Sequence, residues 1–500
     1  MDEMRSCVLG LVCACACACG RLDFDPTPAV SGDGPAGDLQ LVYPVDHAIA
    51  VLGVTPISLV PTLTGSAALS IAPALPAGVN LDPTTGQITG IPTAMADADF
   101  VVTATAGAAT AKATVHIQAL AGYVVDSTAD ASDADGGTDT VCADSAGGCT
   151  LRAAIETANA HGMPALVLLG PATYLVSTQL PALATDIEIA GQGAGVTMIQ
   201  AATLHGNYPA ITCAGSHTLA LRDLGMDDFG GSDGGALAIT AGTLDVDRCS
   251  FTNNASPTSG GVLFINGGSR ATFDHCTFTQ NASLGGNGGG WGGVIDGEGT
   301  GTQIVVRRST ATQNTTAWGS FSHITSGTTL LLESSTLYNN TSNTAGTLAT
   351  PGGVYTLVND TIVGNHNTTT DSAGIYLYSA PCHYTITNTI VAHNDNTAGS
   401  ADCNIRDLST NITSGGGNIL DDAGGNCGQY FTGPGDHLST DPAVVAGAPA
   451  ANGGRTATIL LGSGSPALGD GQASACPATD QRDLPRKSPC DAGAVEMTGN

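Results

Sequence analysis

The 500-residue sequence predicts an all-β protein in which a small β-sandwich precedes a long parallel β-helix. Two observations predict the β-helix. A short phrase returns along residues 219–394, and each copy alternates apolar and polar residues, as a half-buried strand does. The sandwich is predicted because short strand-like runs separated by turns fill residues 38–119.

The repeated phrase has a nearly regular period. Its copies end at residues 228, 254, 281, 314, 340, 365 and 394, so successive copies lie 25 to 33 residues apart. A period in this range indicates a solenoid, propeller or array, and a propeller blade needs about 40–45 residues. We therefore expect one coil of three short strands per copy, with coils stacked about 4.8 Å apart.

An Asn closes most copies. Asn tolerates the left-handed backbone that a tight corner requires, and stacked amides can hydrogen-bond along the stack. Asn254-Ala-Ser256 and Asn281-Ala-Ser283 also match the N-glycosylation pattern, but that pattern arises from the repeat itself, so we favour a structural ladder. The expected ladder residues are Asn254, Asn281, Asn314, Asn340, Asn365 and Asn394.

The charge of the chain restricts its partners. Lys and Arg number 14 and Asp and Glu number 43, which gives a formal net charge of −29. Nucleic acids and anionic membranes are bound through Lys and Arg contacts, so neither is an expected partner. Polyanionic glycans would also be repelled unless divalent cations bridged them.

The fifteen Cys fall into two groups, five near the N-terminus and ten between Cys142 and Cys490. The ten show no zinc-binding spacing, and closely spaced loop Cys in an exported chain indicate disulfides. Cys249 and Cys276 occupy the same repeat position and either stack as buried thiols or bond together. The expected disulfide pairs are Cys142–Cys149, Cys403–Cys427 and Cys476–Cys490.

Residues 1–19 are typical of an export signal, because Arg5 precedes an apolar run that is too short to span a membrane. The segment resembles a bacterial lipoprotein signal, which implies lipid attachment at Cys19, with Cys15 as second choice. An ordinary cleaved signal is the alternative. Residues 20–37, rich in Pro, Gly and Asp, predict a flexible linker.

Residues 38–119 contain a specific motif. The stretch Leu75-Pro-Ala-Gly-Val-Asn-Leu-Asp-Pro-Thr-Thr-Gly-Gln-Ile-Thr-Gly-Ile-Pro92 resembles the Ig-like, cadherin-like domain of bacterial surface proteins. Some relatives bind calcium and adhere, so Ca²⁺ is the single candidate cofactor although none is expected. Asp97 and Asp99 fit a solvated strand edge better than a metal site.

The region 124–497 resembles a second family, and the motifs that carry the resemblance lie near its two ends. Cys149-Thr-Leu-Arg-Ala-Ala is similar to the Cys-Ser-Leu-Arg-Glu-Ala segment that precedes many right-handed β-helices of the pectin-lyase-like fold. The tail from residue 465 to 496 resembles the choice-of-anchor Q ending. Apolar residues at helical spacing predict a capping helix over 150–161, with Thr150 as N-cap and Gly162 after its end.

Polysaccharide-degrading enzymes occur on this fold, so catalytic residues were sought. Asp227-Asp228 matches one polygalacturonase motif, but no Gly-His-Gly or Arg-Ile-Lys is present. The aligned Asp247 and Asp274 are expected to stack about 5 Å apart. A lyase-type cluster would draw on Asp245, Asp247, Arg248, Asp274 and His275. Asp247, Asp274 and Arg248 are thus weak catalytic candidates, and solvent-side strand residues are the favoured interpretation.

The sequence favours a non-catalytic cell-surface protein that adheres or binds glycans through a β-helix on an Ig-like stalk. The alternatives are a polysaccharide lyase or glycoside hydrolase, and a structural spacer. Three or more carboxylates converging with Arg or Lys in one groove would contradict the non-catalytic role. Function is expected where coils differ, chiefly in the turns around Gly230, Trp291 and Trp318.

The expected partners are polysaccharide or cell-surface components, with membrane contact only through the N-terminal lipid. We expect a monomer on the outer membrane or cell surface of a Gram-negative bacterium, or alternatively a secreted protein.

Overall fold

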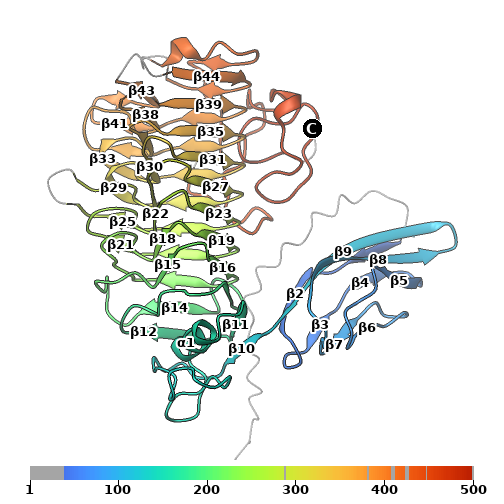
Figure 1. Ribbon diagram of the computed structural model, residues 1–500. Helices are drawn as coiled ribbons and strands as arrows, with labels where there is room; N and C mark the ends of the chain where they lie inside the picture. Colours follow the sequence, from blue (N-terminus) through green and yellow to red (C-terminus); the bar gives the residue numbers. More distant parts are fainter. Residues whose placement is uncertain are drawn as a thin grey trace, which may run out of the picture.

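The computed structural model describes residues 39–285, 289–379, 382–406, 411–422, 427–445 and 447–497. The predicted signal segment with Cys19, and the predicted linker, lie outside the described residues. The described chain forms sandwich-like sheets followed by a β-solenoid of about nine turns, with one short helix before the coils (Figure 1).

The sandwich consists of antiparallel pairs and one parallel pair, β2 with β9. Its buried core includes Ile57, Ile88, Phe100, Val102 and Ile117. Among the described residues its three sheets are β1 (Gln40–Val42) with β4 (Thr62–Thr64); β2 (His47–Val51), β9 (Ala109–Leu120), β8 (Ala96–Ala106) and β5 (Ala68–Ala72); and β3 (Ile57–Leu59), β7 (Ile88–Gly90) and β6 (Val79–Leu81).

Helix α1 (Leu151–His161) precedes the coils and closes their first end (Figure 1). The Thr150 hydroxyl accepts a hydrogen bond from the Ala153 N–H at 3.0 Å, and Gly162 ends the helix in the left-handed conformation. Arg152 is nearly buried and pairs with Asp130 at 2.7 Å. The helix therefore has the predicted caps and a structural Arg.

Each coil adds strands to parallel sheets that run the length of the solenoid. In the described part of the chain the first long sheet contains β10 (Gly122–Val125), β11 (Ala165–Leu169), β13 (Ile187–Ala190), β16 (Thr218–Arg222), β19 (Thr243–Asp247), β23 (Arg270–Asp274), β27 (Gln303–Arg307), β31 (Thr329–Glu333), β35 (Val354–Val358), β39 (His383–Thr387) and β44 (Asn411–Gly416). The second long sheet contains β12 (Thr173–Val176), β14 (Met198–Ala201), β17 (Gly225–Asp227), β20 (Ser250–Thr252), β24 (Thr277–Thr279), β28 (Thr310–Thr312), β32 (Thr336–Tyr338), β36 (Thr361–Val363), β40 (Ile390–Ala392), β45 (Ile419–Leu420) and β46 (His437–Leu438).

Two shorter sheets complete the coils. The eight-stranded sheet contains, within the described residues, β15 (Ile211–Ala214), β18 (Leu237–Thr240), β22 (Leu263–Asn266), β26 (Ile295–Gly297), β30 (Ser322–Ile324), β34 (Leu348–Thr350), β38 (Ile375–Leu377) and β43 (Cys403–Ile405). The seven-stranded sheet contains β21 (Ala255–Ser256), β25 (Ala282–Ser283), β29 (Thr315–Trp318), β33 (Thr341–Ala345), β37 (His366–Asn367), β41 (Asp395–Asn396) and β42 (Gly399–Ser400).

The expectation of three strands per coil was therefore wrong for the middle coils, which have a fourth. The additional strand begins directly after the ladder Asn, as Ala255 does after Asn254 and Ala282 does after Asn281. Because the ladder fixes the corner, the residues that follow it stay in register with their counterparts and extend the parallel pairing.

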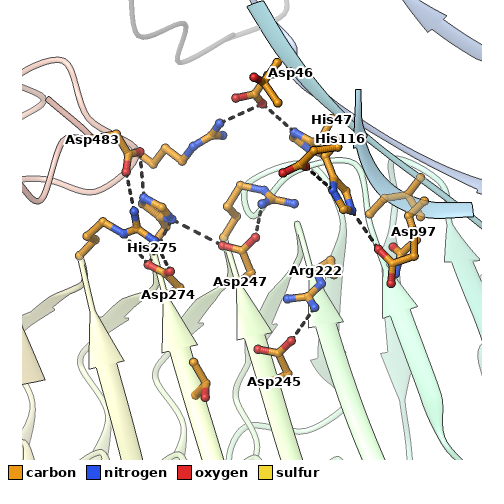
Figure 2. A pocket seen from close by; sticks show the side chains of 18 residues that line it. Asp46, His47, Asp97, His116, Arg222, Asp245, Asp247, Asp274, His275 and Asp483 are labelled. Atoms are coloured by element: carbon orange, nitrogen blue, oxygen red, sulfur yellow. Dashed lines mark hydrogen bonds and ion pairs between the residues drawn. The ribbon is translucent and has the colours of Figure 1, made fainter. Parts of the chain in front are cut away.

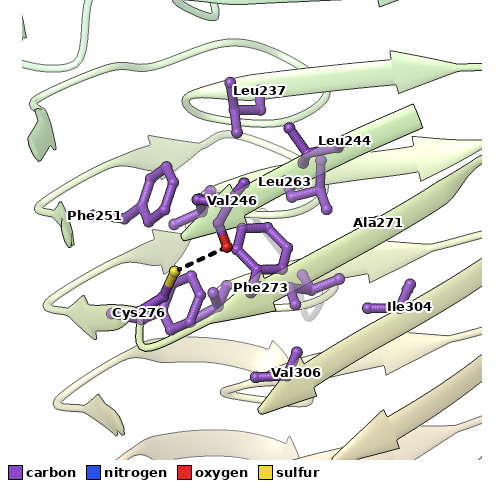
Figure 3. Close-up of a cluster of buried hydrophobic side chains, with 14 of the residues drawn as sticks. Leu237, Leu244, Val246, Phe251, Leu263, Ala271, Phe273, Cys276, Ile304 and Val306 are labelled. Atoms are coloured by element: carbon purple, nitrogen blue, oxygen red, sulfur yellow. Dashed lines mark hydrogen bonds between the residues drawn. The ribbon is translucent and has the colours of Figure 1, made fainter. Parts of the chain in front are cut away.

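The core of the solenoid is a stack of apolar side chains from successive coils (Figure 3). Phe251 and Phe278, from adjacent coils, stack with ring centroids 5.5 Å apart and nearly parallel planes. Cys249 and Cys276 are buried free thiols, so of the two arrangements left open the unbonded one is present. Disulfides join Cys142 to Cys149, Cys403 to Cys427 and Cys476 to Cys490, the pairs suggested by the spacing.

The repeat Asn residues form a buried ladder along one corner. Asn254 donates from its N–H and its amide to the side-chain oxygen of Asn281, at 3.0 and 3.1 Å, and Asn281 does the same to Asn314. The same bonds continue upward until Asn394 donates to Asp402. The full ladder is Asn254, Asn281, Asn314, Asn340, Asn365 and Asn394.

The backbone explanation for these Asn was wrong. The left-handed conformation belongs to the preceding residue of each copy, for example Asn253 (φ 54°), Gln280 (φ 58°) and His393 (φ 55°). The ladder Asn is selected instead by its side chain, which must both donate and accept inside the corner.

The C-terminal tail folds back along the side of the solenoid (Figure 1). Ile459, Leu461 and Val495 pack against Ile390 and Ile419 of the second long sheet. The 3₁₀ helix η3 (Ala473–Ala475) lies in the tail, whereas η2 (Gly428–Tyr430) lies beside β44 at the last coil. The tail thus covers part of an outer face of the coils.

Candidate functional site

A cleft of about 660 Å³ lies where the sandwich, the outer face of the first long sheet and the tail meet (Figure 2). It is lined by Asp46, His47, Ile49, Asp97, Asp99, Thr114, His116 and Gln118 of the sandwich, Arg222, Asp245, Asp247, Arg248, Thr272, Asp274, His275 and Arg308 of the solenoid, and Arg455 and Asp483 of the tail. Charged side chains therefore dominate its walls.

Strand alternation places the carboxylates of the solenoid on the cleft side. In β19, Leu244 and Val246 are buried in the core, so Asp245 and Asp247 point outward. In the next coil Asp274 is the register partner of Asp247. The repeat pattern thus brings these two aspartates side by side.

Three further side chains come from the corner that ends each strand. Arg248, His275 and Arg308 follow β19, β23 and β27 in the left-handed conformation, with φ of 54°, 51° and 46°. This conformation ends the strand at the same point in three successive coils. The three cationic or titratable side chains therefore form a column beside the aspartates.

His275 lies at the centre of the cluster (Figure 2). Its Nδ1 is 3.5 Å from Asp247 and 3.3 Å from Asp274, and its Nε2 is 2.9 Å from Asp483. Arg308 bonds to Asp274 through Nε at 2.9 Å and to Asp483 through Nη1 at 2.9 Å. Three carboxylates thus converge on one imidazole, and two of them also bind one guanidinium.

The neighbouring coils extend this network. Arg248 contacts Asp247 and also binds Asp223 through two nitrogens, at 2.7 and 2.8 Å. Arg222 binds Asp245 at 2.6 Å. Each of these guanidinium groups is therefore already paired with a carboxylate.

Protonation in the cluster follows from this pairing. Burial alone would lower the pKa of His275, but its hydrogen bonds with Asp247 and Asp483 raise that pKa overall. Burial alone would raise the pKa of Asp247 and of Asp483, but the bonds from His275 lower both overall. The cluster therefore favours charged carboxylates around a protonated imidazole.

The sandwich is held against the solenoid by polar contacts and a small apolar patch. His47 Nε2 lies 3.4 Å from Asp223, and Gln118 donates to Glu188 at 2.8 Å. Hydrogen bonds with Asp223 and Asp46 raise the pKa of His47, although burial opposes them. The apolar patch consists of buried Val51, Leu166, Leu168 and Ala190.

The weak candidates Asp247, Asp274 and Arg248 all lie in this cleft. The convergence of carboxylates with Arg that was expected to contradict the non-catalytic role is present, but each of the three carboxylates is already paired with His275 and with Arg248 or Arg308. The sequence analysis did not single out Arg308 or Asp483 as site residues. The column of corner residues could have indicated Arg308, since it aligns with His275, whereas Asp483 lies far along the chain and outside the repeat.

The other acidic residues considered from the sequence lie outside the cleft or on its sandwich wall. Asp227 and Asp228 belong to the second long sheet and its corner, where Asp228 accepts from Asn253 and Gln200, and neither lines the cleft. The largely exposed Asp97 and Asp99 stand on the sandwich wall, where the solvated edge was expected. They contact His116 there.

The protonation states bear on what the cleft can do. Glycoside hydrolysis uses one carboxylic acid with a raised pKa as proton donor and one carboxylate. The pKa of Asp46 is lowered to about 2, chiefly by its bond with His47, and those of Asp247 and Asp483 are lowered too. These groups are suited to accept hydrogen bonds from ligand hydroxyls.

Within the described residues no three His, Cys, Asp or Glu side chains form a group able to hold a metal ion. No described helix is both long and apolar enough to cross a membrane.

Comparison with known families agrees with both domains. Residues 47–119 match the family model described as "Putative Ig domain", and residues 186–391 match the model described as "Right handed beta helix region". These matches confirm the Ig-like module and the right-handed β-helix. No curated protein sequence matches the chain.

Solved structures show a distant likeness. The A-module of mannuronan C-5 epimerase AlgE4 from Azotobacter vinelandii is similar over 58% of this chain and 92% of its own, with 16% identity and a TM-score of 0.28. The A-module of mannuronan C-5 epimerase AlgE6 from the same organism covers the same shares, with 17% identity and a TM-score of 0.24. We draw nothing about activity from a likeness at this level.

Proposed function

We propose that this is an exported surface protein that binds a polysaccharide in the cleft between its Ig-like module and its β-helix, without cleaving it. The observation that carries the proposal is the cleft itself, a space of about 660 Å³ with hydrogen-bonding side chains on three walls. A ligand there would contact the module, the coils and the tail at once, as an adhesion site requires.

The charge of the cleft limits the class of glycan. Seven Asp and four Arg line it, and the whole chain carries a formal charge of −29. Carboxylate oxygens have lone pairs for further hydrogen bonds from sugar hydroxyls, whereas a polyanionic chain would be repelled. A neutral or amino-containing polysaccharide is therefore the expected ligand.

The second candidate is a polysaccharide lyase or glycoside hydrolase. The convergence of Asp247, Asp274 and Asp483 on Arg308 and His275 favours it. The lowered pKa of Asp247 and of Asp483 argues against either of them as the proton donor of a hydrolase, because a proton donor must hold its proton at working pH. A spacer without ligand remains the third candidate.

A glycan array combined with a reducing-end release assay separates these functions. The proposed function predicts binding to a neutral or amino-containing glycan, with no release of reducing ends or unsaturated products. Asp274→Asn should weaken binding roughly tenfold, because one charge-assisted acceptor is lost. Asp441→Asn, at an exposed carboxylate outside the cleft, is the matched control.

Each outcome selects one function. Product release that disappears in the Asp274→Asn variant would establish the enzyme and contradict the proposal. If no glycan binds, the structural spacer is the remaining candidate function.

The surface location rests on the N-terminal segment. We assign lipid attachment to Cys19, which would tether the module through residues 20–37 to the outer membrane, with secretion after ordinary cleavage as the alternative. Radioactive palmitate labelling tests this assignment. A Cys19→Ser protein that is still labelled would rule out Cys19.

A further inference from the structure

The outer face of the eight-stranded sheet carries a second group of ring and polar side chains, away from the cleft. Asp296 of β26 and His323 of β30 are register partners. Their strand neighbours Ile295 and Ile324 belong to the core, so Asp296 and His323 point outward.

These two side chains form a buried pair. His323 Nδ1 lies 2.8 Å from Asp296 Oδ1, and the residues are 6% and 0% exposed. The other carboxylate oxygen, Asp296 Oδ2, is buried without a hydrogen-bond partner among the described residues. Such a group is rare in a folded protein and marks a place where a further partner is needed.

A tryptophan covers the pair. The Trp291 ring stacks on the His323 ring with centroids 6.2 Å apart and planes 29° apart, and Trp291 is 38% exposed. Trp318 is its bridge partner on the next coil, and Tyr378 packs against Trp318 at 4.8 Å. The chain has two Trp in all, so both stand on this face.

A shallow groove of about 660 Å³ runs beside the pair across four successive coils. Hydroxyl, amide and carboxyl groups line it, among them Thr240, Asn266, Glu298 and Thr325, and its lining contains no Lys or Arg. Burial, reinforced by the charge of Asp296, raises the pKa of Glu298. With Glu298 as the one ionisable side chain among the described lining residues, the groove is polar and sparsely charged.

We propose that this face is a second carbohydrate site, which binds an uncharged oligosaccharide along the coils. The exposed Trp291 ring stacks on the apolar face of one sugar ring. His323, oriented by Asp296, supports the inner face of the Trp291 ring, and Asn266 and Glu298 bind hydroxyls of the next sugar.

The chemistry of the face selects this class of ligand. Aromatic rings combined with a few fixed polar groups are typical of small-molecule sites. The groove offers no cation to an anionic sugar. Coils rise about 4.8 Å each, so equivalent groups recur at intervals close to the length of one sugar ring.

The two tryptophans make the site directly observable. Hexasaccharides of β-1,4-glucan, xylan, mannan, chitin and α-1,4-glucan are titrated into the full protein while Trp emission is recorded. We expect at least one to give a saturable change that survives in Trp318→Phe, which leaves Trp291 as the reporter. If none of the five changes the emission, the proposal is overturned.

Two variants test the named residues. His323→Gln should weaken binding of the active hexasaccharide roughly tenfold, because the Trp291 ring loses the imidazole on which it stacks. Trp291→Leu, read through Trp318 emission and by calorimetry, should weaken it as much, and its partly exposed position makes a folded variant expected. Dissociation constants within twofold of the parent for both folded variants would contradict the proposal.

The cleft serves as the control. Asp274→Asn should leave the Trp-detected affinity unchanged, because Asp274 lines the cleft and not the groove. A tenfold loss in that variant would assign the signal to the cleft and overturn the second site.

Discussion

At the scale of single residues, the amide ladder shows how one side chain serves two coils. Asn314 accepts from the Asn281 N–H and amide at 2.9 and 3.0 Å. It donates to Phe278 O at 3.0 Å and to Asn340 at 2.8 Å. Being 0% exposed, it leaves no room for water to replace these bonds.

Asn314→Ala should therefore destabilise the solenoid strongly. The substitution leaves the Asn281 N–H without its acceptor and removes the side-chain bonds to Phe278 and Asn340, which costs about 3 kcal/mol in the free energy of unfolding. Denaturant titration measures that loss. Asn343→Ala, at an exposed position in β33, should change it by less than about 0.5 kcal/mol, and equal losses in both variants would refute the ladder's role.

The histidines between the domains predict a pH dependence. The pKa of His47 is raised by its contacts with Asp223 and Asp46. The folded state thus holds this proton more tightly than the unfolded state, so the contact contributes stability below about pH 6.5. That contribution is lost as the pH rises through the raised pKa.

His47→Gln should flatten this dependence. In the parent protein the thermal midpoint of the sandwich should fall between about pH 6 and pH 8. In the variant the thermal midpoint should fall less over the same pH range, because no imidazole remains to pair with Asp223. A variant with an unchanged slope would show that another group titrates in this range.

Residue-level prediction from the sequence succeeded where the repeat supplies an alignment. The stacking of Asp247 on Asp274 follows from their equal positions relative to Cys249 and Cys276. The left-handed residue of each corner was misplaced by one, because alternation does not show where the backbone turns. Asp483 had no aligned partner at all.

At the scale of elements, the capping helix was predicted correctly from local sequence signals. Thr150 and Gly162 bound α1 as expected from their capping chemistry. Arg152 then fixes the helix to the segment before it and to the first coil, through Asp130 and the carbonyl groups of Thr178 and Gln179. The helix thus protects the open edge of the first coil.

Arg152→Met should loosen this cap. The substitution leaves Asp130 as a nearly buried carboxylate without its Arg partner, which costs about 3 kcal/mol. Hydrogen exchange of β11 and β13 should accelerate, while exchange of β35 and β39, far along the solenoid, should not change. Uniform acceleration would indicate global unfolding instead of a local cap.

The fourth strand of the middle coils could not be predicted from the sequence. Ala255-Ser256 and its equivalents are too short and too small to show alternation. They pair because the ladder Asn before them fixes the register, so their strand character comes from neighbouring coils and could not be read from one copy.

At the scale of the whole molecule, the cleft exists because three distant segments meet. The Ig-like module, four successive coils and the tail each contribute charged groups (Figure 2). The sequence predicted each domain, but contacts such as His275 with Asp483 and Arg455 with Asp46 depend on how the domains fold onto one another. No repeat or motif encodes that placement.

The most direct test of the cleft as the binding site is hydrogen exchange with and without the glycan selected on the array. Occupation of the cleft predicts slower exchange in peptides covering residues 46–49, 245–248 and 272–275 together. Protection confined to peptides around Trp291 and His323 would assign that glycan to the outer face of the eight-stranded sheet. Such a result would contradict the cleft.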